Sequence, residues 1–195
     1  MKYGILGGTF DPPHLGHRAI ADAAKSTLEL DEVIWIPAGR NPLKTRKTLS
    51  ARHRMAMVEL AVAEHDSFSV SDIEISRGGP SYTYDTIEEL HMVQPGEYWL
   101  ILGTDAMKDI EKWRKAEKLA ELVRFAVIER PGNTYDQVHG RLPQTFSERM
   151  KRISMTTSPV SSSNIREGIH YGRPVEQWLE PAVWQYINEN GLYID

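Results

Sequence analysis

The chain has 195 residues, of which 41% are hydrophobic, so we expect one domain spanning residues 1–195 around a single substantial core. It contains no cysteine, which excludes disulfides, thiolate catalysis and cysteine-ligated metals. A net charge of −4 disfavours a nucleic-acid-binding surface, and no apolar run approaches the ~20 residues that span a bilayer, so we expect a cytoplasmic protein with neither nucleic-acid nor membrane partners.

The first half of the chain alternates predicted strands and helices. β-branched apolar runs predict strands, and apolar side chains at helical spacing predict helices. In chain order these are a strand at 2–6, a helix at 14–28, a strand at 32–36, a helix at about 50–64 and a half-exposed strand at 68–75. Met55, Val58 and Val62 form the apolar stripe expected of the second helix.

The second half continues the alternation and ends in helices. In chain order we expect a helix at 83–92, a strand at 97–102, a helix at 116–122, a strand at 124–128, a loop with one short helix over 131–149, a strand at 153–156 and a last helix at 181–190. This order predicts an α/β fold: a Rossmann-like, doubly wound, mainly parallel sheet with helices on both faces. A small C-terminal helical element is expected at about 163–195.

Three glycine-bearing turns follow predicted strands. They are residues 7–17, 103–105 and 130–132. Ligands of parallel α/β sheets lie beyond the carboxyl ends of the strands. We therefore expect these three turns to converge on one crevice.

The first of these turns has the properties of an anion site. Gly7 and Gly8 allow a close approach to the backbone, and a helix beginning near His14 directs free N–H groups and its positive dipole end to the same space. His14 and His17 face that space together. The turn is neither a P-loop nor a GxGxxG fingerprint.

Two further segments favour an anionic ligand. Residues 40–54 contain no Asp or Glu. Their basic residues are Arg40, Lys44, Arg46, Lys47, Arg52 and Arg54. This run predicts a local positive field, although a solvated loop is the alternative. Near the C-terminus, the hydroxyls of residues 161–163 precede a helix that has Arg166 in its first turn, which predicts a second anion site.

The chain resembles a known enzyme family over nearly its whole length. Residues 7–17 resemble the signature of the nucleotidyltransferase superfamily whose hallmark is His-x-Gly-His, and residues 161–166 resemble its Ser-Ser-Thr-x-Ile-Arg motif, with Ser163 in place of threonine. Within that superfamily, residues 41–44, 81–86 and 103–106 and Trp113 resemble the bacterial nicotinate mononucleotide adenylyltransferases.

The resemblance implies a reaction and its partners. The phosphate of nicotinate mononucleotide would attack the α-phosphorus of ATP, giving nicotinate adenine dinucleotide and pyrophosphate, with Mg²⁺ bound to the ATP phosphates. Transfer between two bound anions needs positioning and charge neutralisation more than a protein nucleophile. The family leaves open whether the chain is a monomer or a homodimer.

The resemblance also assigns residues to roles. His17 would donate to the transferred phosphate, His14 would support the ATP phosphates, and Lys44 and Arg166 would neutralise developing charge; these four are the expected catalytic residues. The expected ATP-binding residues are Gly7, Gly8, Thr9, Phe10, His14, His17, Gly103, Asp105, Ser161, Ser162, Ser163, Ile165 and Arg166. The expected residues for nicotinate mononucleotide are Lys44, Tyr82, Thr83, Trp113, Asp105 and Arg130.

In the acceptor site, Trp113 would stack on the nicotinate ring and Thr83, with nearby backbone amides, would hold its carboxylate. Asp105 would accept a hydrogen bond from a ribose hydroxyl or lie near the adenosine.

Several alternatives stay open at this point. His14 and His17 have the spacing of a zinc pair, but no cysteine and no evident third ligand accompany them, so we expect no protein-bound metal. Asp11 is better explained as a hydrogen-bond acceptor that shapes the turn than as a catalytic base. A sister transferase acting on another phosphorylated acceptor, such as phosphopantetheine, and a non-catalytic nucleotide-binding module on the same fold are the competing functions.

Overall fold

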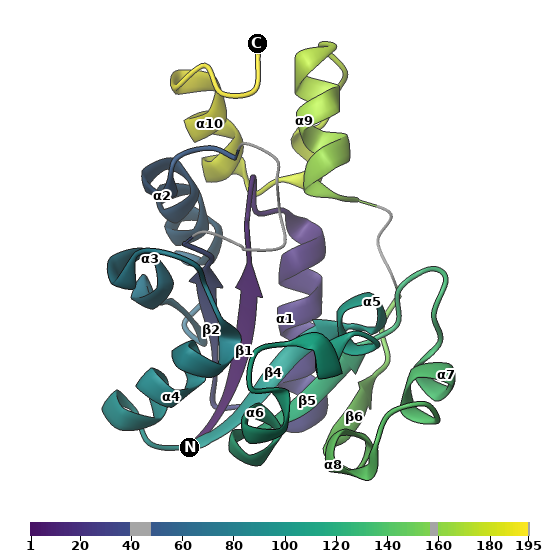
Figure 1. Ribbon diagram of the computed structural model, residues 1–195. Coiled ribbons are helices and arrows are strands. Elements are labelled where there is room, and N and C mark those ends of the chain that lie inside the picture. Colours follow the sequence, from purple (N-terminus) through teal and green to yellow (C-terminus); the bar gives the residue numbers. More distant parts are fainter. Residues whose placement is uncertain (40–47, 157–159, 195) are drawn as a thin grey trace.

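A six-stranded parallel sheet forms the centre of the computed structural model, which describes residues 1–39, 48–156 and 160–194 (Figure 1). The strands are β1 (Lys2–Gly8), β2 (Glu32–Pro37), β3 (Phe68–Val70), β4 (Glu97–Gly103), β5 (Val123–Ile128) and β6 (Met150–Ile153). Their order across the sheet is β3-β2-β1-β4-β5-β6, and every neighbouring pair is parallel. The predicted α/β fold is confirmed.

The sheet reverses its winding between β1 and β4. From β1 the chain moves outward to β2 and β3, and from β4 it moves outward in the other direction to β5 and β6. Connections leaving two neighbouring strands in opposite directions open a crevice at their carboxyl ends. This point of the sheet is therefore where a ligand is expected.

Helices cover both faces of the sheet. One face packs against α1 (Leu15–Leu28) and α2 (Ala51–Val62), and the other packs against α4 (Thr83–Val93) and α6 (Ala116–Leu122). The strands are buried between two apolar clusters, as expected of parallel sheets. The shorter elements are α3 (Ile73–Arg77), α5 (Thr104–Met107), η1 (Ile110–Lys112), α7 (Tyr135–His139) and α8 (Gln144–Ser147). No helix in the described part of the chain is long and apolar enough to cross a membrane.

A C-terminal helical element sits above the carboxyl ends of the strands (Figure 1). It consists of α9 (Ser162–His170), η2 (Glu176–Trp178) and α10 (Pro181–Glu189). Its apolar side chains, including the buried Ile165, Val183 and Ile187, form a third cluster with Met57 and Ala61 of α2. The C-terminal element predicted from the sequence is thus confirmed.

Two strand predictions differ from the structure. The alternation over 68–75 predicted one strand, but β3 ends at Val70 and the following apolar residues belong to the helical turn α3. Ser71 and Asp72 interrupt the strand because both favour turns and helix starts. The last strand, expected at 153–156, lies at Met150–Ile153.

Two helix predictions also differ. Residues 131–149 contain two short helices, α7 and α8, where one was expected. In α2 the most deeply buried apolar side chains are Met57 and Val58, and Met55 is only half-buried. The same buried face includes Arg54, and a cation there obscures the apolar stripe in the sequence.

Candidate active site

A cavity of about 450 Å³ opens at the reversal point between β1 and β4. Its floor is formed by the ends of β1, β2 and β4, and its walls by the α3–α4 connection and the segment after η1. Lining residues that bear on its chemistry are Gly7, Gly8, Glu74, Ser81, Tyr82, Thr83, Lys112, Trp113 and Arg114. The volume lies within the range of small-ligand pockets, so one mononucleotide-sized ligand fits.

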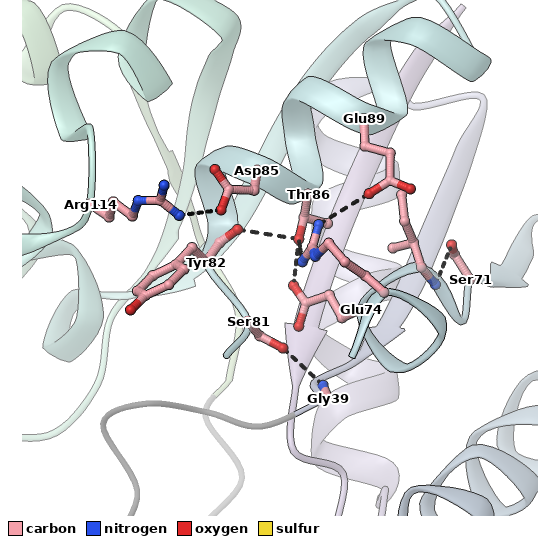
Figure 2. Close-up of polar contacts among 11 residues, drawn as sticks. Gly39, Ser71, Glu74, Ser81, Tyr82, Asp85, Thr86, Glu89 and Arg114 are labelled. Atoms are coloured by element: carbon pink, nitrogen blue, oxygen red, sulfur yellow. Dashed lines mark hydrogen bonds and ion pairs between the residues drawn. The ribbon is translucent and has the colours of Figure 1, made fainter. Parts of the chain in front are cut away.

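The start of α4 forms one wall of this cavity (Figure 2). Tyr82 is the N-cap residue and makes no side-chain cap, so none of the first-turn N–H groups is satisfied by it. Ser81 Oγ accepts a hydrogen bond from Gly39 N at 2.9 Å. This bond ties the backbone just after β2 to this wall. In the described structure, the N-cap side chain leaves the N–H groups next to Thr83 unbonded, and such a helix start suits an anionic group.

A buried threonine fixes α4 relative to α3. Thr86 is 2% exposed, and its Oγ1 lies 2.9 Å from Glu74 Oε1 and accepts a hydrogen bond from Arg77 Nη2 at 2.8 Å (Figure 2). Arg77 also pairs with Glu89. The sequence interpretation missed this network, although Glu74 and Thr86 both line the cavity.

The opposite wall is held by an ion pair that the sequence interpretation also missed. Trp113 is half-buried against the core and lines the cavity. The next residue, Arg114, pairs with Asp85 of α4, and its guanidinium lies 4.7 Å from the centroid of the Tyr82 ring. Arg114 thereby connects the Trp113 segment to the start of α4, and Figure 2 shows its contact with Asp85.

Phe10 closes the turn that follows β1. Its backbone has a φ of 50°, which is unusual for an aromatic residue, and its side chain is 2% exposed. The Phe10 ring packs 5.3 Å from the Trp35 ring and 5.0 Å from the His17 ring. A Cβ on Gly8 would lie 3.0 Å from the Phe10 ring, so the turn needs glycine at that position.

His17 is held in one tautomer by the backbone. The backbone N–H of His14, the N-cap residue of α1, donates to His17 Nδ1 at 3.2 Å. Since Nδ1 accepts this bond, the proton of the neutral imidazole is assigned to Nε2. His17 therefore presents a hydrogen-bond donor at the far side of its ring.

His14 lies beneath His17 and is kept neutral. The two rings stack with centroids 3.8 Å apart. Burial, with a further contribution from the charge of Arg130, lowers the pKa of His14 from 6.5 to about 4. His14 Nδ1 is buried without a hydrogen-bond partner in the described structure. A Cβ on Gly16 would lie 2.9 Å from both this nitrogen and the Val160 side chain, which explains the glycine between the two histidines.

The lowered pKa of His14 predicts a pH dependence of stability. Unfolded His14 takes up a proton below pH 6.5, whereas the folded protein resists it until about pH 4. The free energy of unfolding should therefore fall as pH drops through this window, with a contribution from His14 on the order of 3 kcal/mol. Urea unfolding between pH 7 and 4 should show a shallower dependence for His14→Gln than for the wild type. His170→Gln, at an exposed site, should keep the wild-type slope, and equal slopes for all three proteins would contradict this assignment.

The two sequence motifs, which lie about 150 residues apart, meet in the structure. Arg166 donates from Nη1 to the Asp11 carbonyl oxygen at 2.5 Å and from Nη2 to Ser163 Oγ at 2.9 Å. Ser162 Oγ donates to the Pro12 carbonyl oxygen at 2.8 Å. Ser161 Oγ accepts from Asn164 N at 3.2 Å, so it also caps α9. The start of α9 is thereby fixed against the turn that precedes the histidines.

Two expected site residues do not contribute a described side chain to this surface. Ile165 is 0% exposed, its side chain lies in the C-terminal apolar cluster, and its N–H bonds to the Ser161 carbonyl oxygen. Lys44 lies outside the described residues.

Arg130, Gly103 and Asp105 lie on the histidine side of the site. A Cβ on Gly103 would collide with the Asp105 carboxylate and would lie 2.9 Å from the Arg130 side chain. Arg130 also lines a small cavity with His14 and Val160. Arg130 was expected to contact nicotinate mononucleotide. It is not among the residues that line the cavity with Trp113.

Arg54 is a buried residue that binds backbone carbonyl oxygens, whereas the sequence interpretation placed it in a local positive field. It is 2% exposed and donates to the carbonyl oxygens of Thr9 at 2.9 Å, Gly39 at 3.2 Å and Leu49 at 3.2 Å. Its charge is therefore not part of an exposed positive field. The signal available in the sequence was its helical phase, since Arg54 shares a face with the buried Met57 and Val58.

The site contains many donors and few metal ligands. Within residues 1–39, 48–156 and 160–194, no group of three or more His, Asp or Glu side chains is placed to hold a metal ion. Histidine, arginine and backbone N–H groups instead form a surface suited to anions.

Comparison with known proteins gives a consistent result. The cytidylyltransferase-like family model matches residues 5–168. A protein of Herpetosiphon aurantiacus named "Probable nicotinate-nucleotide adenylyltransferase" is 41% identical, with 100% of this chain and 99% of that protein covered. A protein of Roseiflexus with the same name is 42% identical, with 97% and 96% covered.

Solved structures share the fold. The structure described as "Plasmodium falciparum nicotinic acid mononucleotide adenylyltransferase complexed with NaAD" superposes with a TM-score of 0.81, covering 98% of this chain and 97% of that one. The sequences are 20% identical, so this likeness concerns the fold.

Proposed function

We propose, from the premise that this chain belongs to the cytidylyltransferase-like family and, within it, to the nicotinate-nucleotide adenylyltransferases, that it joins ATP and nicotinate mononucleotide. A phosphate oxygen of the mononucleotide forms a bond to the α-phosphorus of ATP, the bond from that phosphorus to the bridging oxygen breaks, and pyrophosphate leaves. The products are nicotinate adenine dinucleotide and pyrophosphate, with no covalent enzyme intermediate. The observation that supports this most strongly is the mononucleotide-sized cavity beside a turn where His17, Arg166 and a helix start converge.

On the ATP side, the geometry favours donors over bases. We assign the proton on His17 Nε2 to a hydrogen bond with the transferred phosphate, because Nδ1 accepts the His14 N–H. We assign His14, Thr9 and Phe10 to the ATP phosphates, the last two through backbone N–H groups. Arg166, and Lys44 by resemblance, neutralise charge on the leaving pyrophosphate. Each such donor supplies about 2.7 to 4 kcal/mol of transition-state stabilisation.

On the acceptor side, the cavity supplies an aromatic face and a helix start. We assign Trp113 to the nicotinate ring, and Thr83 with the first-turn N–H groups of α4 to its carboxylate. Tyr82 lines the same wall. The position of Arg130 beside His14 favours a contact with the nucleotide phosphates over one with the pyridine ring.

Mg²⁺ fits this site as a companion of ATP. The described residues offer donors for anions and no ligand cage, and Mg²⁺ in phosphoryl-transfer sites is commonly bound in part by substrate phosphates. We therefore assign Mg²⁺ to the phosphate oxygens of ATP, where it supplies charge neutralisation.

Pyrophosphate release tests the function directly. The protein with MgATP should release pyrophosphate when nicotinate mononucleotide is added, and much less with nicotinamide mononucleotide or phosphopantetheine. Preference for phosphopantetheine would instead favour a sister transferase. No release with any acceptor would leave a non-catalytic nucleotide-binding module as the explanation.

Replacing Trp113 tests the acceptor side separately. Trp113→Ala should raise KM for nicotinate mononucleotide by about 10- to 100-fold, because stacking on a heterocyclic base is worth about 1 to 3 kcal/mol. KM for ATP should change by no more than about 2-fold, and Trp113→Phe should lie between the two because it keeps an aromatic face. Steady-state kinetics with each substrate varied in turn measures this. A rise in KM for ATP as large as that for the mononucleotide would rule out the assigned role.

A further inference from the structure

Near its C-terminal end the chain returns to the turn after β1. Tyr193 Oη donates a hydrogen bond to Asp11 Oδ1 at 2.8 Å, joining residues 182 positions apart. Asp11 is 2% exposed. A buried polar group needs hydrogen-bond partners, and Tyr193 supplies one to Asp11 from a segment outside both sequence motifs.

Local sequence directs Tyr193 toward that carboxylate. Gly191, with a φ of 58°, ends α10, its N–H bonds to the Asn188 carbonyl oxygen at 3.2 Å, and Leu192 N bonds to the Ile187 carbonyl oxygen at 3.0 Å. These two bonds form a Schellman motif, and the apolar contact expected with it is made by Leu192 and Ile187 in the C-terminal cluster. The helix stop therefore fixes the direction in which the chain leaves α10.

The turn that receives Tyr193 is held from two other elements. Arg54 of α2 donates to the Thr9 carbonyl oxygen at 2.9 Å, and Arg166 of α9 donates to the Asp11 carbonyl oxygen at 2.5 Å. Burial lowers the pKa of the Arg54 guanidinium, and the charge of Asp11 opposes that effect by favouring the charged form. The Asp11 carboxylate thus accepts a hydrogen bond from the Tyr193 hydroxyl and favours the charged form of the buried Arg54.

We propose that Tyr193 is a positioning residue for adenylyl transfer, acting through Asp11 to hold the turn that leads into His14 and His17. This inference rests on the proposed function and adds to it a residue beyond the two motifs. Tyr193 contacts no reacting atom. Its effect comes from geometry, because displacement of catalytic donors by about 1 Å can lower a rate by about 10²-fold.

A single hydroxyl deletion with a matched control tests the proposal. Tyr193→Phe should lower kcat/KM for ATP by about 10-fold and leave KM for nicotinate mononucleotide within about 2-fold, since Asp11 is not among the residues that line the cavity with Trp113. Tyr186→Phe is the control, because Tyr186 also belongs to the C-terminal element. Its hydroxyl lies 2.9 Å from Nδ1 of His53 in α2, a contact that does not involve the turn. The control should keep wild-type kinetics.

Melting temperatures separate positioning from simple loss of stability. Both variants should melt within a few degrees of each other, because each loses a hydroxyl hydrogen bond, and such a bond is worth about 1 kcal/mol. Wild-type kinetics in Tyr193→Phe would overturn the proposal. So would an equal fall in kcat/KM in Tyr186→Phe at an equal melting temperature.

A double variant tests whether Asp11 mediates the effect. If it does, Asp11→Asn combined with Tyr193→Phe should lower kcat/KM for ATP by no more than the worse single variant. A fall in kcat/KM equal to the product of the two single-variant falls would show that Tyr193 does not act through Asp11.

The proposal is also distinguishable from the proposed function. If the wild type released no pyrophosphate with any acceptor, the proposed function would fail. Calorimetry would then show whether Tyr193→Phe, and not Tyr186→Phe, weakens MgATP binding by several-fold. Equal MgATP affinities in the two variants would overturn the positioning role by itself.

Discussion

His17→Ala should lower kcat by about 10²- to 10³-fold while the protein remains folded. The proton of the neutral wild-type ring is assigned to Nε2 because Nδ1 accepts the His14 N–H at 3.2 Å, and loss of one such donor to a developing oxyanion costs about 2.7 to 4 kcal/mol. The ring also packs against Phe10, so a modest loss of stability, about 1 kcal/mol, should accompany the kinetic effect. Steady-state pyrophosphate release and far-UV circular dichroism measure the two effects.

The matched control for His17 is another histidine outside the site. His170 lies at the exposed C-terminal end of α9 and its ring contacts Tyr171. His170→Ala should retain wild-type turnover. Turnover of His17→Ala within a few-fold of the wild type would remove His17 from the mechanism.

Arg166→Ala should lower kcat/KM for ATP by about 10²-fold. Its guanidinium is fixed by two hydrogen bonds, to the Asp11 carbonyl oxygen and to Ser163 Oγ, and a fixed guanidinium is a pre-organised partner for phosphate oxygens. Arg166→Lys should recover only part of the activity, because an ammonium group cannot make the planar, two-nitrogen contact. Initial rates with ATP varied at saturating nicotinate mononucleotide measure the loss.

The matched control for Arg166 is an exposed arginine. Arg173 follows α9, pairs with Glu167 and lies over the Tyr171 ring, all on the surface. Arg173→Ala should keep wild-type kinetics. Equal losses in both variants would indicate a general effect on α9, and full recovery by Arg166→Lys would show that charge alone suffices.

The local motifs could be predicted because their physical requirements are local. Gly7 and Gly8 leave the backbone open, His14 and His17 lie within one helical turn, and the alternation of strands and helices limits the topology to a parallel sheet. The structure confirms the last two, with His14 at the N-cap of α1, His17 three residues later and the sheet parallel throughout. At Gly8 the Phe10 ring occupies the space beside the backbone. Apolar periodicity failed at residues 68–75, because Ser71 and Asp72 end the strand and the next apolar pair, Ile73 and Ile75, lies in α3.

The residues that support the site could not be predicted because their partners are distant in sequence. Arg54 lies within a basic run and would be assigned to the surface on charge alone, yet three carbonyl oxygens from separate segments make its burial favourable. The pairing of Arg114 with Asp85, which fixes the cavity wall, joins segments 29 residues apart.

By itself, the sequence determined the fold class and the family, and it located the two motifs that predict anion binding, because each depends on residue types at fixed short spacings. Only the tertiary structure decided which surfaces meet. It placed Arg130 beside His14, buried Ile165 in the core and brought Tyr193 to Asp11. The physical reason is that a buried hydrogen bond depends on the positions of both partners, and packing of the whole chain sets those positions when the partners are far apart in sequence.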